Sequence, residues 1–526
     1  MSTLLAAALT GLAALSLEIL GVRWLAPWFG TTSLVWSNQI GVVLLAMAAG
    51  AALGGRLARR GGPPWRAASA LLVGAGLLLG LALIALPAFC AWVLPDGLRL
   101  DEAAGIALGG SLAGALLFFA PPVLLLSMVA PLLVEIRAAE RGAGRAAGEV
   151  SAAGTVGSLL GVFGSTYLAI PFLGVRPTLA LLGACLVLAG ALLGARRWRL
   201  RAAALLPFLP LLLADPAARA NLPRIDGLDT SLLAVEETPY QRLRVVGFRA
   251  AGAQQDTERW LQMNEGLDSY QSLWRPDTTW PGGYYDLFAL APLAAFAPED
   301  PGEARFWSLG HAGGAALGPV AAALTAREWR AVGVELDPAA VALGAQWLPL
   351  QEEAAARTEV RVGDARLLLR GAPQDLDFLL LDAYSAQFEI PAHLATVEFF
   401  AEARGHLRAG GVMAVNLGAS SLAGTRGGAV GGVISGMREA FDDHVRLHRV
   451  PFSRNVMVLA CAGQPLPPLE EMGRRLPAGL PSFLGGALLP GQTLEGAALP
   501  AGEPYRDDRS RLALEQAREW LGGGDA

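Results

Sequence analysis

Four positions in the second half of the chain, one glycine and three carboxylates, each follow a short apolar run. Gly310 lies in the glycine-rich segment SLGHAGG, and Glu335 closes the run in AVGVELD. Asp364 follows TEVRVG, and Asp382 follows LDFLLL, a run apolar enough for a central strand. Because polar residues that close buried strands lie at one edge of a sheet, these four are the first candidates for a binding or catalytic site.

The chemistry of these positions suits a nucleoside. A glycine-rich turn between a strand and a helix lets the backbone approach a ligand closely, although this signal alone is weak. Glu335 lies about where a carboxylate accepts the hydrogen bonds of two ribose hydroxyls, and Asp364 is placed to accept from an adenine amino group. Each carboxylate could instead cap a helix or close a turn. Their order on successive strands favours the nucleoside site.

The surrounding segments predict the sheet that positions these residues. RFWSLG, AVGVELD, TEVRVGDA, LDFLLLDAY and GGVMAVNL are typical of buried strands, and helical stretches separate them. This alternation predicts a parallel sheet covered on both faces. Upstream, residues 236–248 alternate like a strand and residues 259–264 supply its hairpin partner, after a polar linker at about 216–235.

The first 215 residues predict a membrane domain. A hydrocarbon core of about 30 Å needs about 20 apolar residues per helix. Six segments satisfy this length, at about 4–26, 34–55, 67–94, 104–134, 148–170 and 177–195. Arginines follow the second, fourth and sixth segments, so the positive-inside rule predicts a cytoplasmic amino terminus in a multi-pass inner-membrane protein.

The apolar stretch 202–214 leaves undecided on which side of the membrane the second half of the chain lies. It is short and contains Pro207 and Pro210. If it crosses the bilayer, the second half lies outside the cell, and if it lies in the interface, the second half is cytoplasmic. We expect the interface and a cytoplasmic second half, because a nucleoside ligand needs a cytosolic supply.

Composition excludes other classes of function. The net charge of −5 and the absence of a basic stripe exclude a nucleic-acid footprint. The three cysteines lie far apart, and the five histidines lack metal-ligand spacing, so we expect neither a disulfide framework nor a metal.

Several motifs together resemble the spermidine synthases, the polyamine aminopropyltransferases. TPYQRLRV resembles the family's Tyr-Gln strand, and YYDLFALAPL its Tyr-His-Glu helix. VELD, VGDA and LDAYS resemble the family's Glu-Ile-Asp, Gly-Asp-Gly and Asp-Ser-Ser-Asp motifs. EILGVRWLAPWFG and VWSNQIG in the membrane half resemble the membrane-fused members. The resemblance implies a Rossmann-like methyltransferase fold with a small β-hairpin subdomain, and decarboxylated S-adenosylmethionine as co-substrate.

The same resemblance implies a role for each candidate residue. Asp382 would be catalytic, because it would receive the proton of the attacking amine or orient that amine. The cofactor-binding residues would be Gln241, Gly310, Glu335 and Asp364, and the substrate-binding residues Tyr284, Asp268 and Ser385. The partners would be a small amine such as putrescine and the lipid bilayer, with self-association into a homo-oligomer left open and no nucleic acid.

Four positions depart from the family pattern. The Asp of the glycine-rich loop is Gly313, the second Asp of the catalytic motif is Ser385, the hairpin Gln is Asp268, and the His of the Tyr-His-Glu helix is Tyr285. The loss of two carboxylates weakens the prediction of a dicationic acceptor, because each would pair with one ammonium group.

The sequence therefore predicts an α-helical transmembrane bundle followed by an α/β Rossmann-like domain. The expected divisions are 1–215 for the bundle, 216–300 for a linker and small β-subdomain, 301–465 for the nucleoside-binding domain, and 466–526 for a carboxy-terminal extension. The expected function is membrane-bound aminopropyl transfer. Two alternatives stay open: methyl transfer from intact S-adenosylmethionine, and a transporter-like membrane protein with a regulatory nucleoside-binding domain.

Overall fold

The computed structural model describes residues 3–520 apart from 96–99, 194–202, 214, 265–266, 268, 297–301, 325–326, 385–388, 419–427, 452, 477–481 and 490. The chain forms two compact units. The first comprises Met1–Pro223, Val235–Arg242 and Asn264–Asp268, and the second comprises Arg224–Ala234, Leu243–Met263 and Ser269–Ala526.

The first unit is a bundle of long apolar helices. Within the described residues, six helical segments are long and apolar enough to cross a membrane, which confirms the six predicted segments. They are α1 (Thr3–Phe29), α2 (Ser33–Arg59), α3 (Pro64–Val93), α4 (Leu100–Gly114) continuing through η1 (Ala115–Phe119) into α5 (Ala120–Arg141), α6 (Ala143–Gly164) continuing through η2 (Ser165–Ala169) into α7 (Ile170–Leu173), and α8 (Val175–Leu193). The short 3₁₀-helices η3 (Ala203–Leu212) and η4 (Pro216–Arg219) follow.

Glycines let helices α1 and α6 of the bundle approach closely. A Cβ added at Gly157 or Gly161 of α6 would collide with the carbonyl oxygens of Ala8 and Leu12 on α1. Small residues at such contacts allow the close backbone packing on which association of helices in lipid depends. This geometry gives the glycines of α6 a packing role against α1.

A four-stranded antiparallel sheet follows the bundle in the chain. Its order is β1-β2-β3-β4, with β1 (Leu228–Glu237), β2 (Arg242–Ala250), β3 (Glu258–Met263) and β4 (Ser272–Trp274). The predicted hairpin corresponds to β2 and β3, which pair antiparallel from Leu243–Met263 to Phe248–Glu258. The prediction of a linker over 216–235 was wrong in part, because residues from Leu228 onward form the partly exposed edge strand β1, whose polar side chains hid its pattern.

The second unit is built on a larger sheet. In the described part of the chain its strand order is β12-β10-β11-β9-β8-β5-β6-β7. The strands are β5 (Ala304–Leu309), β6 (Trp329–Glu335), β7 (Thr358–Val362), β8 (Leu376–Leu381), β9 (Leu407–Gly418), β10 (Val445–Arg449), β11 (Asn455–Cys461) and β12 (Thr493–Glu495). The five predicted strands are β5 to β9, which are parallel to their neighbours in this set.

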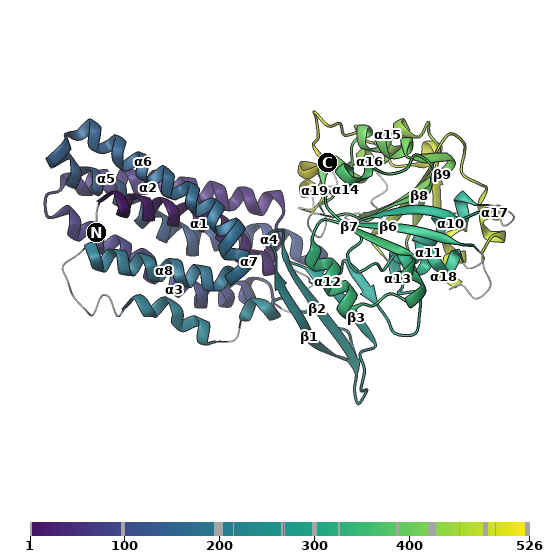
Figure 1. The fold of residues 1–526 in the computed structure, drawn as a ribbon, viewed down its shortest axis with the longest axis horizontal. Helices are drawn as coiled ribbons and strands as arrows, with labels where there is room; N and C mark the ends of the chain where they lie inside the picture. The colour runs from purple at the N-terminus through teal and green to yellow at the C-terminus, as the bar shows by residue number, and fades with distance from the viewer. Residues whose placement is uncertain are drawn as a thin grey trace. The chain divides into compact units, whose positions relative to one another are not determined.

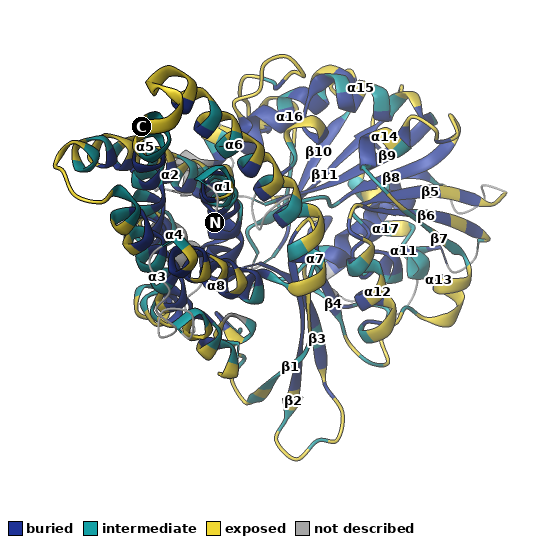
Figure 2. Cartoon of the chain, turned by 60° about the vertical axis from the view of Figure 1, so that its left-hand side comes forward, coloured by how far each residue is buried: buried dark blue, intermediate teal, exposed yellow. Residues whose placement is uncertain are grey.

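This topology confirms the predicted Rossmann-like methyltransferase fold. The parallel strands follow the order third, second, first, fourth, fifth, and the antiparallel β11 lies between β9 and β10. Strand β8 is buried along its whole length, as expected for the apolar run before Asp382 (Figure 2). The hydrophobic core on one face of the sheet joins α14 (Ala365–Leu369), α15 (Val397–Gly405) and α16 (Gly428–Ala440).

The remaining helices of this unit cover the rest of the sheet or extend the chain (Figure 1). They are η5 (Gly283–Ala289), α10 (Leu290–Ala295), α11 (Leu317–Ala323), α12 (Pro338–Trp347), α13 (Glu352–Ala356), η6 (Ala392–Leu394), α17 (Leu469–Arg474), α18 (Ser482–Ala487), η7 (Gly496–Ala498) and α19 (Leu512–Trp520).

The contact between α1 and α6 gives a test of the bundle. We expect Gly157→Ala to lower the stability of the protein in detergent by about 1–3 kcal/mol, the usual cost of overpacking. The control is Gly164→Ala at the end of the same helix, where an added Cβ has no neighbour within 4 Å. Equal thermal unfolding midpoints for the two variants would contradict this packing.

Candidate functional site

The glycine-rich turn after β5 is fixed against the neighbouring strand ends. The amide groups of Gly310 and His311 both donate to the carbonyl oxygen of Val334 on β6, at 3.0 and 2.9 Å. Gly310 has φ 87°, and a Cβ at this position would collide with the carbonyl oxygen of Asp382. Glycine is therefore required where the end of β5 turns beside the end of β8.

Glu335 joins the end of β6 to this turn. One carboxylate oxygen accepts from the amide of Ala312 at 2.8 Å, and the other accepts from the amide of Asp337 at 3.1 Å. Burial raises the pKa of Glu335, and these two backbone donors act in the opposite direction. A carboxylate oxygen has more than one acceptor direction, so Glu335 can hold the turn and still accept from a ligand.

Asp364 follows β7 and begins α14. One carboxylate oxygen accepts from the amide of Leu367 at 2.9 Å, which makes Asp364 the N-cap of this helix. The other oxygen lies 3.0 Å from Nε2 of His393. Asp364 therefore does cap a helix, which was one of the roles considered from the sequence. The Asp364 side chain is about one-third exposed, and its oxygens can still accept further hydrogen bonds from a ligand.

Asp382 closes β8, and its carboxylate is held by Asn416. The Nδ2 group of Asn416, on β9, donates to Asp382 at 2.8 Å. Asn416 in turn accepts from Nδ2 of Asn455 on β11 at 2.8 Å. Burial raises the pKa of Asp382 to about 6, while hydrogen bonds from Asn416 and Tyr284 act in the opposite direction. Such a carboxyl group can change its protonation state near neutral pH.

Aromatic side chains lie beside this carboxylate. The Asp382 charge contributes to raising the pKa values of Tyr284 and Tyr285 well above the usual range, although burial is the largest cause. The two tyrosine rings lie 4.2 Å apart between centroids, and Tyr285 stacks with Tyr270 at 6.1 Å. An aromatic wall next to a carboxylate can bind an ammonium group together with its alkyl chain.

The predicted residues fall into three groups. The first group lies at the ends of neighbouring strands, which follow the order β7, β6, β5, β8 across the sheet. Its members are Asp364 after β7, Glu335 at the end of β6, Gly310 after β5 and Asp382 after β8. Tyr284 contacts Asp382. Gln241 belongs to the first unit, where its backbone bonds with Thr238. Asp268 and Ser385 lie outside the described residues.

Sequence reasoning missed three groups that shape the site: Asn416, Asn455 and His393. Asn416 carried a usable signal, because it is a polar residue near the end of the apolar strand GGVMAVNL. Asn455 carried none, because its place opposite β9 depends on the register of an antiparallel pair. The approach of His393 to Asp364 joins residues 29 positions apart and is equally invisible in the sequence.

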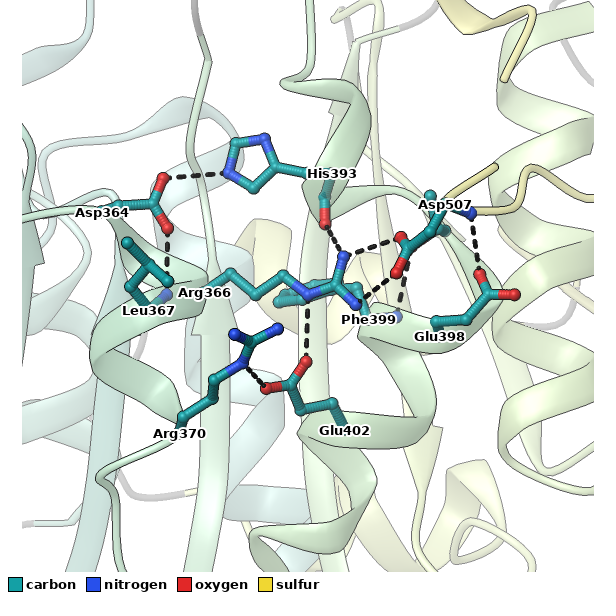
Figure 3. A network of polar contacts seen from close by, with 10 residues as sticks. Asp364, Arg366, Leu367, Arg370, His393, Glu398, Phe399, Glu402 and Asp507 are labelled. Atoms are coloured by element: carbon teal, nitrogen blue, oxygen red, sulfur yellow. Dashed lines mark hydrogen bonds and ion pairs between the residues drawn. The ribbon is translucent and has the colours of Figure 1, made fainter. Parts of the chain in front are cut away.

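The carboxy-terminal extension is held to α14, the helix that follows β7 and Asp364 (Figure 3). Arg366 of α14 donates through both terminal nitrogens to the carboxylate of Asp507, at 2.7 and 2.8 Å. It also donates to Glu402 at 3.0 Å and to the carbonyl oxygen of His393 at 3.0 Å. The helix that Asp364 caps and the segment that carries His393 are thus held together by one guanidinium group.

Comparison with known proteins supports the resemblance found in the motifs. No protein-family profile matches the chain. The chain is 36% identical to the polyamine aminopropyltransferase of Vibrio vulnificus over 86 residues, which is 16% of this chain and 28% of that relative. The chain resembles polyamine aminopropyltransferases. The match spans little more than a quarter of the relative's length.

The solved structures to which the chain shows some similarity include spermidine synthases and a methyltransferase. A probable spermidine synthase from Corynebacterium glutamicum is 20% identical, with a TM-score of 0.38, and the match covers 54% of this chain and 98% of that one. A spermidine synthase in complex with the transition-state analogue AdoDATO is 14% identical, with a TM-score of 0.35 and coverage of 49% and 85%. Human methyltransferase-like protein 13 in complex with SAH is 19% identical, with a TM-score of 0.28 and coverage of 39% and 89%.

The Arg366–Asp507 pair gives a test of the extension. We expect Asp507→Asn to destabilise the protein by about 1–2 kcal/mol, between the effects typical of exposed and of buried pairs, because Arg366 is largely buried. The control is Glu439→Gln, which removes the exposed partner of Arg506 and should cost less. Thermal unfolding of the full chain measures both, and an equal effect would contradict a fastening role for Asp507.

Proposed function

We propose that this chain is a membrane-bound aminopropyltransferase. It transfers the aminopropyl group of decarboxylated S-adenosylmethionine to an amine such as putrescine. The observation that carries the proposal is the half-buried carboxyl group of Asp382, which lies beside two tyrosines and against the glycine turn held by Glu335. The motif resemblance and the similarity to a polyamine aminopropyltransferase support the same reaction.

The residues at the strand ends have separate roles in this reaction. Glu335 accepts from the ribose hydroxyls, and the free acceptor positions of Asp364 accept from the adenine amino group. The sulfonium donor is already activated, so positioning accounts for most of the rate. The acceptor nitrogen forms a bond to the propyl carbon, the carbon–sulfur bond breaks with its electrons going to sulfur, and methylthioadenosine leaves.

Asp382 manages the proton of the acceptor amine. An ammonium group has no lone pair, so one proton must leave the nitrogen before or during attack. The Asp382 carboxylate takes or orients this proton. The hydrogen bond that Asn416 of β9 donates to this carboxylate fixes its orientation. Tyr284, which is partly exposed and hydrogen-bonds to Asp382, contacts the alkyl part of the acceptor.

The carboxylate of Asp286 interacts with groups other than those around Asp382. It accepts from the amide of Gly282 at 3.0 Å, and the charge of Arg275 lowers its pKa against the larger effect of burial. Asp382 is the carboxylate whose charge acts on Tyr284 and Tyr285. A panel of acceptors with one and with two amino groups is therefore the appropriate substrate screen.

Ligand binding and one substitution test the assignment together. By calorimetry we expect the purified chain to bind decarboxylated S-adenosylmethionine and methylthioadenosine more tightly than intact S-adenosylmethionine. Asp382→Asn should lower kcat by about 100-fold or more, the usual contribution of a general base, and leave nucleoside binding intact. The control, Asp375→Asn, removes an exposed carboxylate just before β8 begins and should keep its activity.

The binding results separate the alternatives. Equal or tighter binding of intact S-adenosylmethionine would favour methyl transfer. Nucleoside binding without turnover on any amine, together with solute flux that persists in Asp382→Asn, would favour a regulatory domain on a transporter-like bundle. Full turnover by Asp382→Asn would contradict the catalytic role of this residue.

The pH dependence of turnover follows from the same carboxyl group. Burial raises the pKa of Asp382 to about 6, so the proton-accepting form predominates above that pH and kcat should fall as pH drops through about 6. Asn416→Leu removes a donor that favours the charged form. Since such a bond is worth about 1.5–3 kcal/mol and one pKa unit about 1.4 kcal/mol, the acid limb of the kcat profile should move up by about one to two pH units. An unmoved limb would contradict this assignment.

A further inference from the structure

The arginine-rich loops lie at one end of the helical unit. In the described residues, α5 ends beside the start of α1, because Nη1 of Arg137 lies 3.4 Å from the hydroxyl of Thr3. Helices α1 and α6 run parallel, since Gly157 faces Ala8 and Gly161 faces Leu12. The arginines between α2 and α3 and between α5 and α6 therefore share the end of the bundle that holds the amino terminus. They are Arg56, Arg59, Arg60, Arg66, Arg137, Arg141 and Arg145.

The path of η3 leads away from that end. Helix α8 runs antiparallel to α3, with Gly183 facing Gly76 and Gly190 facing Ser69, so it finishes at the arginine-rich end. Arg196, Arg197, Arg199 and Arg201 follow it in the sequence. Helix η3 then returns alongside both helices, because Pro207 would meet a Cβ added at Gly183 or Gly80 at 3.2 and 3.0 Å.

The end of η3 is held at the start of α8. Arg176, in the first turn of α8, donates from Nη1 to the carbonyl oxygen of Leu213 at 3.1 Å and from Nη2 to that of Pro210. Ten residues of 3₁₀-helix rise about 20 Å, which is most of the thickness of a hydrocarbon core. The chain has therefore crossed back to the end of the bundle where α8 begins.

The surface of η3 suits a position in lipid. Its prolines are buried against the bundle, whereas Leu205, Leu209 and Leu212 are 67%, 53% and 83% exposed. Prolines lack the N–H group that would bond to carbonyl oxygens one turn earlier, and unpaired carbonyl groups are costly in hydrocarbon. At the end of η3 the carbonyl oxygen of Pro210 accepts from the amide of Leu213 at 3.1 Å as well as from Arg176, and the carbonyl oxygen of Leu213 accepts from Arg176.

The segments that lead into the second unit stay at this same end. Nδ2 of Asn221 donates to the carbonyl oxygens of Pro27 and Trp28 at the end of α1, at 3.4 and 3.3 Å. Nδ2 of Asn264 donates to the hydroxyl of Thr31 at 3.1 Å. These residues all belong to the first unit, so the chain leaves this unit at the α1–α2 loop, opposite the arginine-rich loops.

We propose that the second unit, with the candidate site, lies on the non-cytoplasmic side of the membrane. The positive-inside rule places the arginine-rich end in the cytoplasm, and the chain leaves at the other end. This replaces the expectation, drawn from sequence, that 202–214 lies in the interface and leaves the second half cytoplasmic. The path of η3 along α3 and α8 is the observation that reverses it.

The proposal has a consequence for the reaction, which rests on the proposed function. A sulfonium nucleoside carries charge and does not cross a hydrocarbon layer unaided. If it is made in the cytosol, a transmembrane transport step must deliver it to this site. The acceptor amine is then drawn from the same outer compartment.

Cysteine labelling of the full chain tests the sidedness directly. In a Cys185→Ala background, where the remaining Cys90 and Cys461 are buried, one variant carries Gly144→Cys in the arginine-rich loop and another carries Asp508→Cys in the second unit. Both positions are exposed. We expect a membrane-impermeant maleimide to label Asp508→Cys on intact spheroplasts, and Gly144→Cys only after permeabilisation. Labelling of both from one side, or the reverse pattern, would overturn the proposal.

Turnover in sealed vesicles separates this proposal from the proposed function. With external decarboxylated S-adenosylmethionine and amine, right-side-out vesicles should release methylthioadenosine without detergent, and inverted vesicles only after detergent opens them. Turnover confined to intact inverted vesicles would overturn the sidedness and leave the reaction standing. Absence of turnover in opened vesicles, with the expected labelling, would overturn the reaction and leave the sidedness standing.

Discussion

A carboxyl group that closes a buried strand must either find hydrogen-bond donors in the protein or remain protonated, and this constraint shapes the candidate site. Asp382 follows a strand that is buried along its length, and the amide of Asn416 on the neighbouring strand supplies a donor. The result is a carboxyl group whose pKa lies near 6. Without that donor the group would favour its neutral form and could not take a proton from an amine.

The same constraint acts at the other strand ends, with different outcomes. Glu335 accepts from two backbone amides and holds the glycine turn, so in the proposed function ribose binding and the local fold depend on one side chain. Asp364 uses one oxygen to cap α14 and directs the other toward His393. Both residues are structural and remain able to accept further bonds, so the structural and ligand-binding interpretations made from sequence do not exclude each other.

The parts of this account that sequence could predict are those set by local pattern. The apolar runs before Glu335, Asp364 and Asp382 predict parallel strands, and their closing carboxylates follow from the rule that ligands bind at the carboxyl edge. Asn416 obeys the same rule and could have been found. The contacts of Asn455 and His393 depend on strand register and loop path, which no local pattern encodes. Strand β1 was missed because its short apolar run LLAV stands between polar residues at both ends of the strand, after a proline-containing segment.

The membrane half shows the same division. Length and hydropathy predict the six spans, and loop arginines predict which end faces the cytoplasm. Whether 202–214 crosses depends on what it packs against, and the contacts of Pro207 and Arg176 support the crossing proposed above. A short proline-containing segment is a poor spanning helix alone, but it can follow two longer helices that cover one side of it and supply a donor for its carbonyl groups.

The most direct test of the account's central claim is an experimental structure of the full chain with methylthioadenosine. We expect ribose hydroxyls within hydrogen-bonding distance of Glu335, and a sulfur atom directed toward Asp382 and the tyrosine pair. A nucleoside bound elsewhere, or an Asp382 carboxylate turned away from the bound sulfur, would contradict it.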